Sequence, residues 1–111
     1  MDALFSSSVA NEFAALPPLP LSMEIHGEAL DLTPLRVGEL PAFVRAIRSF
    51  AEQLTTSVDW LGIFADHGDA LLDALAIASR RPRSWVEALA LDEAIRLGEA
   101  LLEVNADFFI Q

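Results

Sequence analysis

Apolar residues follow a helical spacing through most of this chain. Between residues 39 and 109 they recur at intervals of three and four, which is the period of an α-helix with one buried face. The clearest amphipathic segment is 39–54, and the longest is 93–109. Gly68 and Pro82 interrupt the pattern between them. The sequence therefore predicts a mainly α-helical fold with about five helices in one compact domain.

Short polar residues predict where several of these helices begin. Asp59 and Asp92 are placed to cap the helices that follow them, since an Asp side chain can accept a hydrogen bond from a free N–H of the first turn. Ser84 and Glu87 have the spacing of a capping box. The segment 69–80 begins with acidic residues and is followed by arginines, which suits the helix dipole.

The N-terminal part of the chain has a different pattern. Residues 22–35 alternate between apolar and polar, with a turn signal at His26-Gly27-Glu28, and this favours a small β-hairpin. Before it, the run Leu16-Pro17-Pro18-Leu19-Pro20 removes backbone donors and favours an extended chain. We therefore expect an N-terminal arm with a proline-rich linker, residues 1–21, and a helical domain, residues 22–111. An ordinary loop is the alternative interpretation of the proline-rich run.

The charge and composition exclude several classes of function. Seventeen Asp and Glu stand against seven Arg and two His, for a formal net charge of −10. Nucleic acid and anionic membranes are therefore expected to repel the chain. No apolar run approaches the ~20 residues of a membrane span, the N-terminus lacks the pattern of a secretory signal, and cysteine is absent. We expect a cytoplasmic protein without a membrane or nucleic-acid partner.

Side chains suited to catalysis or metal binding are few. The best candidates are acidic and imidazole groups around one predicted helix boundary: Asp66, His67, Asp69 and Asp73. Helix capping and solvation explain this set better than a hard-metal or acid–base site. Glu99 and Glu103, one turn apart, are expected on a solvated helix face. Because no nucleophile elbow, phosphate-binding loop or HExxH motif occurs, we expect no enzymatic activity, cofactor or metal.

The last predicted helix carries more apolar surface than a single face requires. Its apolar residues cover an arc of about 180° at 100° per residue, and Gly98 and Asn105 lie within it. Gly98 is expected to admit another backbone and Asn105 to make a buried hydrogen bond. Alternatively, part of the arc binds a partner protein. The candidate protein-binding residues, for which burial in the core is the competing explanation, are Trp60, Trp85, Leu101, Val104, Asn105, Phe108 and Phe109.

Three stretches together resemble the small tail assembly chaperones of long-tailed bacteriophages. They are LTPLRVGELPAF at 32–43, HGDALLDALAIA at 67–78 and LLEVNADFF at 101–109. The combination, ending in Val-Asn-Ala-Asp-Phe-Phe, carries the resemblance, which covers residues 22–111 and leaves out the N-terminal arm.

The resemblance implies a protein that binds the tape-measure protein, keeps its apolar helices soluble and helps recruit tail-tube protein in the cytoplasm of the infected host. A partner-binding apolar arc would also permit a homo-oligomer. The alternative is a small acidic regulatory or inhibitory protein, from a phage or a bacterium, that binds one macromolecular target.

Overall fold

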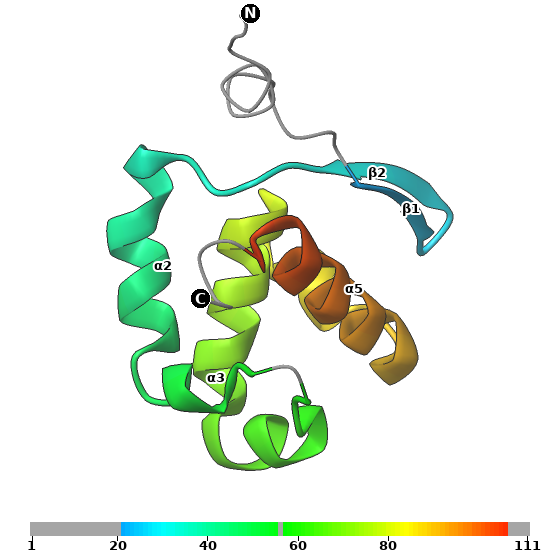
Figure 1. The fold of residues 1–111 in the computed structure, drawn as a ribbon. Helices are drawn as coiled ribbons and strands as arrows, with labels where there is room; N and C mark the ends of the chain where they lie inside the picture. Colours follow the sequence, from blue (N-terminus) through cyan, green and yellow to red (C-terminus); the bar gives the residue numbers. More distant parts are fainter. Residues whose placement is uncertain (1–20, 56, 107–111) are drawn as a thin grey trace, which may run out of the picture.

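The computed structural model describes residues 21–55 and 57–106 of this chain. An antiparallel hairpin is followed by four α-helices in this part of the chain, as Figure 1 shows. The elements are β1 (Leu21–Ile25), β2 (Glu28–Leu32), α2 (Leu40–Ile47), α3 (Trp60–Ser79), α4 (Arg83–Glu87) and α5 (Leu91–Val104), with 3-10 turns η1 (Val37–Glu39) and η2 (Ala51–Gln53). The predicted fold class, mainly α with a small N-terminal hairpin, is confirmed. Apart from Leu21, the predicted arm lies outside the described residues.

The hairpin has the turn that its sequence predicts. Leu21 pairs with Leu32 and Ile25 with Glu28, so the strands are joined by two residues, His26 and Gly27. Both have positive φ, +56° and +77°, which is the conformation of a type I′ turn. The backbone N–H of His26 also donates to Glu93 Oε2 of α5 at 3.2 Å, which holds the turn against the last helix.

The segment predicted as one helix over 39–54 forms two elements. Helix α2 ends at Ile47, and η2 follows after Phe50, whose φ of −135° and ψ of 15° break the helix. This break lets both Phe50 and Leu54 enter the core, where they are 2% and 8% exposed. The pull of two buried side chains therefore outweighs the continuation of the helical pattern.

The two helices predicted on either side of Gly68 are joined into α3 with a kink. The kink lies at His67, whose φ of −138° and ψ of 36° are not helical. The N–H of Gly62 donates to Asp59 Oδ1 at 3.1 Å, so the predicted cap at Asp59 is confirmed. The helix ends at Arg80, which has a left-handed φ of +60°.

The other two predicted caps are wrong, because glutamates and arginines take their places. Helix α4 begins after Pro82, and Glu87 accepts a hydrogen bond from Arg83 Nε at 2.7 Å instead of completing a box with Ser84. Helix α5 begins at Leu91. Its N-terminus is held by Glu93, which accepts from the N–H of Ala90 at 2.9 Å, so Asp92 is not the cap.

Helix α3 lies at the centre, with α2, α4 and α5 packed against it (Figure 1). Helix α5 also contacts both strands of the hairpin, so its broad apolar arc serves two neighbours. Leu97, in the middle of that arc, has no exposed surface. None of the described helices combines the length and the apolarity that crossing a bilayer requires.

Candidate functional site: an apolar groove between two helices

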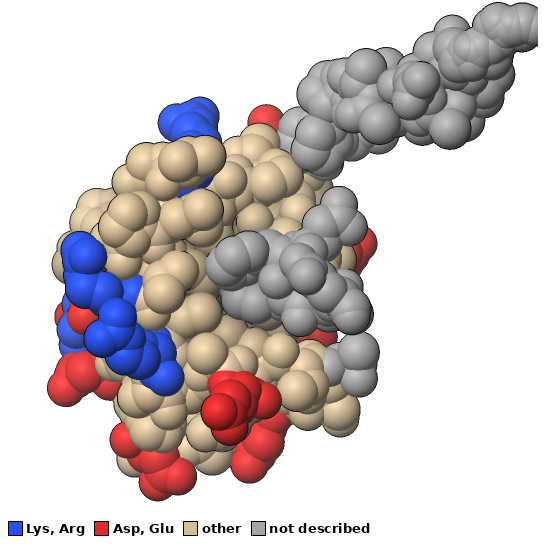
Figure 2. Space-filling model, turned by 60° about the vertical axis from the view of Figure 1, so that its left-hand side comes forward, with Lys and Arg blue, Asp and Glu red and all other residues tan. Residues whose placement is uncertain are grey.

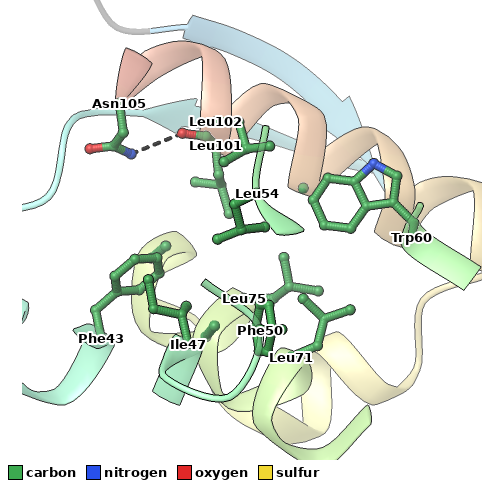
Figure 3. Close-up of a pocket in the computed structure, with 13 residues that line it drawn as sticks. Phe43, Ile47, Phe50, Leu54, Trp60, Leu71, Leu75, Leu101, Leu102 and Asn105 are labelled. Atoms are coloured by element: carbon green, nitrogen blue, oxygen red, sulfur yellow. Dashed lines mark hydrogen bonds between the residues drawn. The ribbon is translucent and has the colours of Figure 1, made fainter. Parts of the chain in front are cut away.

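An apolar groove runs between α2 and α5, with α3 as its floor, and we call it the α2–α5 groove (Figure 3). It encloses about 360 Å³, including its open mouth. This is near the lower end of the ~300–1,000 Å³ typical of ligand sites. Its lining residues, of which all but one are apolar, are Phe43, Ile47, Phe50, Leu54, Trp60, Leu71, Ala74, Leu75, Ala78, Gly98, Leu101, Leu102 and Asn105.

Helical spacing explains why these side chains gather here. Each helix contributes residues three, four or seven positions apart, which share one face. On α3, for example, Leu71, Leu75 and Ala78 form the floor, and on α5 Leu101 and Asn105 form part of a wall. Because α2 and α5 both pack against α3, the groove is left between them.

The polar residue of the groove, Asn105, connects its two walls. Its Nδ2 donates to the carbonyl of Leu101 at 2.9 Å, and its Oδ1 accepts from the backbone N–H of Leu35 at 2.9 Å. Leu35 lies in the loop that leads to α2, so the end of α5 is bonded to the beginning of the opposite wall. Asn105 is 6% exposed, and the buried hydrogen bond that the sequence predicts is confirmed.

Trp60 and Gly98 fit together at the other side of the groove. A Cβ atom on Gly98 would lie 2.6 Å from Cη2 of the Trp60 indole, far inside van der Waals contact. The Trp60 Nε1–H donates to Glu99 Oε2 at 2.6 Å, so Glu99 is exposed but not merely solvated. Gly98 therefore admits an indole ring and not a second backbone, which corrects the expectation from the sequence.

Arg80 fixes the position of α2 relative to α3. Its Nε and Nη2 donate to the two carboxylate oxygens of Glu39 at 2.6 and 2.9 Å. The same guanidinium donates to Thr33 Oγ1 and to the carbonyl of Pro34. Burial raises the pKa of Glu39, but the hydrogen bonds from Arg80 and from the Arg36 N–H outweigh it and hold the pKa below its usual value. This clamp lies at the same end of α2 as the bond to Asn105.

Charges lie around the uncharged part of the surface, as Figure 2 shows. Basic side chains form a column on one side and acidic side chains gather below, with a broad uncharged area beside them. Arg45 and Arg48 are exposed on α2 and have no ion pair with any residue that the structure describes. By contrast, Arg83 is bound by Asp69, Asp73 and Glu87 at 2.6 to 3.0 Å, first of all by Asp69, and its pKa is raised.

The acidic and imidazole residues around the α3 kink do not form a site. Asp69 and Asp73 accept hydrogen bonds from Arg83, and the His67 ring packs against Phe50 with centroids 5.9 Å apart. Within residues 21–55 and 57–106, no three His, Asp or Glu side chains are placed to hold a metal ion. The groove itself has no titratable side chain, so its chemistry is that of apolar contact.

The structure brings three of the predicted binding residues together. Trp60, Leu101 and Asn105 all line the α2–α5 groove. Val104 is half-buried against the core and does not line it. Trp85 lies on α4, where the Arg81 guanidinium carbon is 5.2 Å from its ring centroid. Its buried Nε1–H has no acceptor among the described residues. Phe108 and Phe109 lie outside the described residues.

Sequence reasoning missed the residues that α2 and α3 contribute to the groove. Phe43, Ile47 and Phe50 follow the same i, i+4, i+7 spacing as any core face, so nothing in the pattern distinguishes them. Only the packing of α2 and α5 on either side of α3 makes them one wall of a groove.

Comparison of the chain with models of protein families, with curated proteins and with solved structures found no match. The fold and the groove therefore define the class by themselves. The protein is a small, mainly α-helical domain with an apolar groove between two of its helices.

Proposed function

We propose that this protein is a binding protein without catalytic function, and that it acts as a tail assembly chaperone of a long-tailed phage in the host cytoplasm. Its client is an apolar helix of the tape-measure protein, which binds in the α2–α5 groove. The observation that carries the proposal is the groove itself, in which twelve of thirteen lining residues are apolar. The resemblance of the three sequence stretches to such chaperones supplies the identity of the client.

The lining favours a peptide over a small molecule. Small-molecule sites combine apolar walls with a few convergent polar groups that fix orientation. In the α2–α5 groove, the polar residue Asn105 already bonds to Leu35 and Leu101. An amphipathic helix needs no such groups, since it binds through apolar side chains at i, i+3 or i+4 and i+7.

The size of the groove sets the expected affinity. Three client side chains at ~2 kcal/mol each contribute ~6 kcal/mol from buried apolar surface. The costs of association oppose this gain. We therefore expect binding no tighter than micromolar, where 1 µM corresponds to ~8 kcal/mol. Such binding suits a chaperone that must release its client during assembly.

The test is co-expression with the tape-measure protein of the same phage, measuring the soluble fraction of the client. Leu102→Ala removes a half-buried side chain from the groove, and Leu61→Ala makes the same chemical change at a 60% exposed site on α3 outside it. We expect the wild type and Leu61→Ala to keep the client soluble and Leu102→Ala to do so several-fold less. A client that precipitates with the wild-type protein, or equal behaviour of the two variants, contradicts the proposal.

The charge of the chain supports a second candidate, a regulatory or inhibitory protein that binds one macromolecule through its acidic surface. The net charge is −10, and Arg80, Arg81 and Arg83 are already paired within the fold. Association through that surface would weaken steeply with added salt, whereas binding in the apolar groove would change little. Affinity measured over a salt series distinguishes the two.

A further inference from the structure

The α2–α5 groove is shielded on more sides than its walls explain. Phe43 and Ile47 on one wall are each 6% exposed, and Leu101 on the other is 5% exposed. Yet every described residue that lines the groove belongs to α2, α3, α5 or the turn between α2 and α3, which form two walls and a floor. A cover for the mouth must therefore come from outside this set.

The chain continues from the rim of the groove. Helix α5 ends at Val104, and the next residue, Asn105, lines the groove and is fixed there by its bonds to Leu35 and Leu101. Residues 107–111 follow, and they include three consecutive large apolar residues, Phe108-Phe109-Ile110. Five residues reach up to ~17 Å, which exceeds the ~10 Å width of a helix. The segment is long enough to turn back over α5 into the groove.

We propose that Phe108, Phe109 and Ile110 bind in the α2–α5 groove of their own chain and close it to other occupants. Their chemistry matches the lining, because the groove accepts apolar side chains and has no titratable group. The contact is intramolecular, so the segment acts at an effective concentration in the millimolar range. Binding of the segment stands by itself, whereas its competition with a client rests on the proposed function.

Competition has a measurable consequence for the client. If the segment occupies the groove for nine-tenths of the time, the apparent affinity of a client falls about tenfold, since only the open fraction binds. A variant that ends at Ala106 should bind the client about tenfold more tightly than the full chain. The segment would then be an autoinhibitory element that a client must displace.

Trp60 reports on the groove directly, since its ring lines it. With Trp85→Phe as background, Trp60 is the sole tryptophan. A synthetic peptide of residues 105–111 is titrated into the variant that ends at Ala106. We expect a saturable change in Trp60 fluorescence, no change with the full chain, and no change with the same peptide carrying Phe108→Ser and Phe109→Ser.

Full-length protein carrying Phe108→Ala and Phe109→Ala serves as a second variant if the shortened chain does not fold, and it should respond to the peptide in the same way. Identical Trp60 spectra for the full and altered chains, together with no peptide response, would overturn the proposal. A dimer in light scattering whose spectrum changes with protein concentration would also overturn it, since the segment would then bind a second copy. If the peptide binds but no client does, the proposed function fails and this inference stands.

Discussion

Gly98→Ala tests how tightly Trp60 is held in the groove wall. The new Cβ would lie 2.6, 2.8 and 3.0 Å from Cη2, Cζ3 and Cζ2 of the indole, whereas carbon atoms in contact lie ~3.5–4.0 Å apart. The ring must therefore move by ~1 Å. It has little freedom to do so, because Trp60 is 7% exposed and its Nε1–H is bonded to Glu99 at 2.6 Å.

The expected loss of stability is the difference between two opposing effects. Overpacking of this kind costs ~1–3 kcal/mol. Replacing glycine by alanine within a helix gains ~0.5–1 kcal/mol, because the unfolded chain loses conformational freedom. We therefore expect Gly98→Ala to lower the free energy of unfolding by about 1–2 kcal/mol, and to lower Tm by about 4–8 °C for a chain of this length.

Urea unfolding followed by circular dichroism at 222 nm measures the effect. Gly68→Ala is the matched control, since no heavy atom lies within 4 Å of its Cβ position and it is also in α3. The control should be as stable as the wild type or more so. A Trp60→Leu background should remove most of the cost of Gly98→Ala. A Gly98→Ala protein as stable as the wild type would refute the reasoning.

Three further predictions concern the polar contacts around the groove. Asn105→Ala leaves a backbone N–H and a carbonyl without their partner and should cost ~1–3 kcal/mol in urea unfolding. Glu39 has a lowered pKa, so the stability it adds is present above its usual value of 4.5 and is lost as the pH falls through the lowered pKa. Glu39→Gln should therefore be less stable than the wild type at neutral pH, and the difference in a pH series should shrink below 4.5. Arg83→Ala should cause a small loss of stability that high salt abolishes, because its three carboxylate partners are exposed.

Local features of the fold follow from the sequence because short-range physics determines them. The His26-Gly27 turn needs two residues with positive φ, and Asp59 needs only the N–H of Gly62, three residues away. The helix boundary near Gly68 appears as a kink at His67. Even the buried bond of Asn105 could be predicted, since a polar residue within an apolar arc must find a partner.

The features that the sequence did not predict depend on residues far apart in the chain. Whether Glu87 caps a helix or binds Arg83 is decided by competition between two partners, and the guanidinium wins. The role of Gly98 depends on Trp60, 38 positions earlier, whose ring fills the space that a side chain would need. The groove is the clearest case, since each of its faces looks like an ordinary core face until three helices are assembled.

The distribution of polar contacts indicates how the groove can open. Both long-range bonds to the chain around α2, from Asn105 to Leu35 and from Arg80 to Glu39, lie at the N-terminal end of that helix. The other end leads through Phe50 and Leu54, which are held by apolar contacts in the core. Hydrogen bonds have narrow geometric limits, whereas apolar contacts tolerate sliding. Helix α2 should therefore swing about its bonded end, so that the groove widens at the end near Phe50 and Trp60, and Trp60 should sense an incoming helix first.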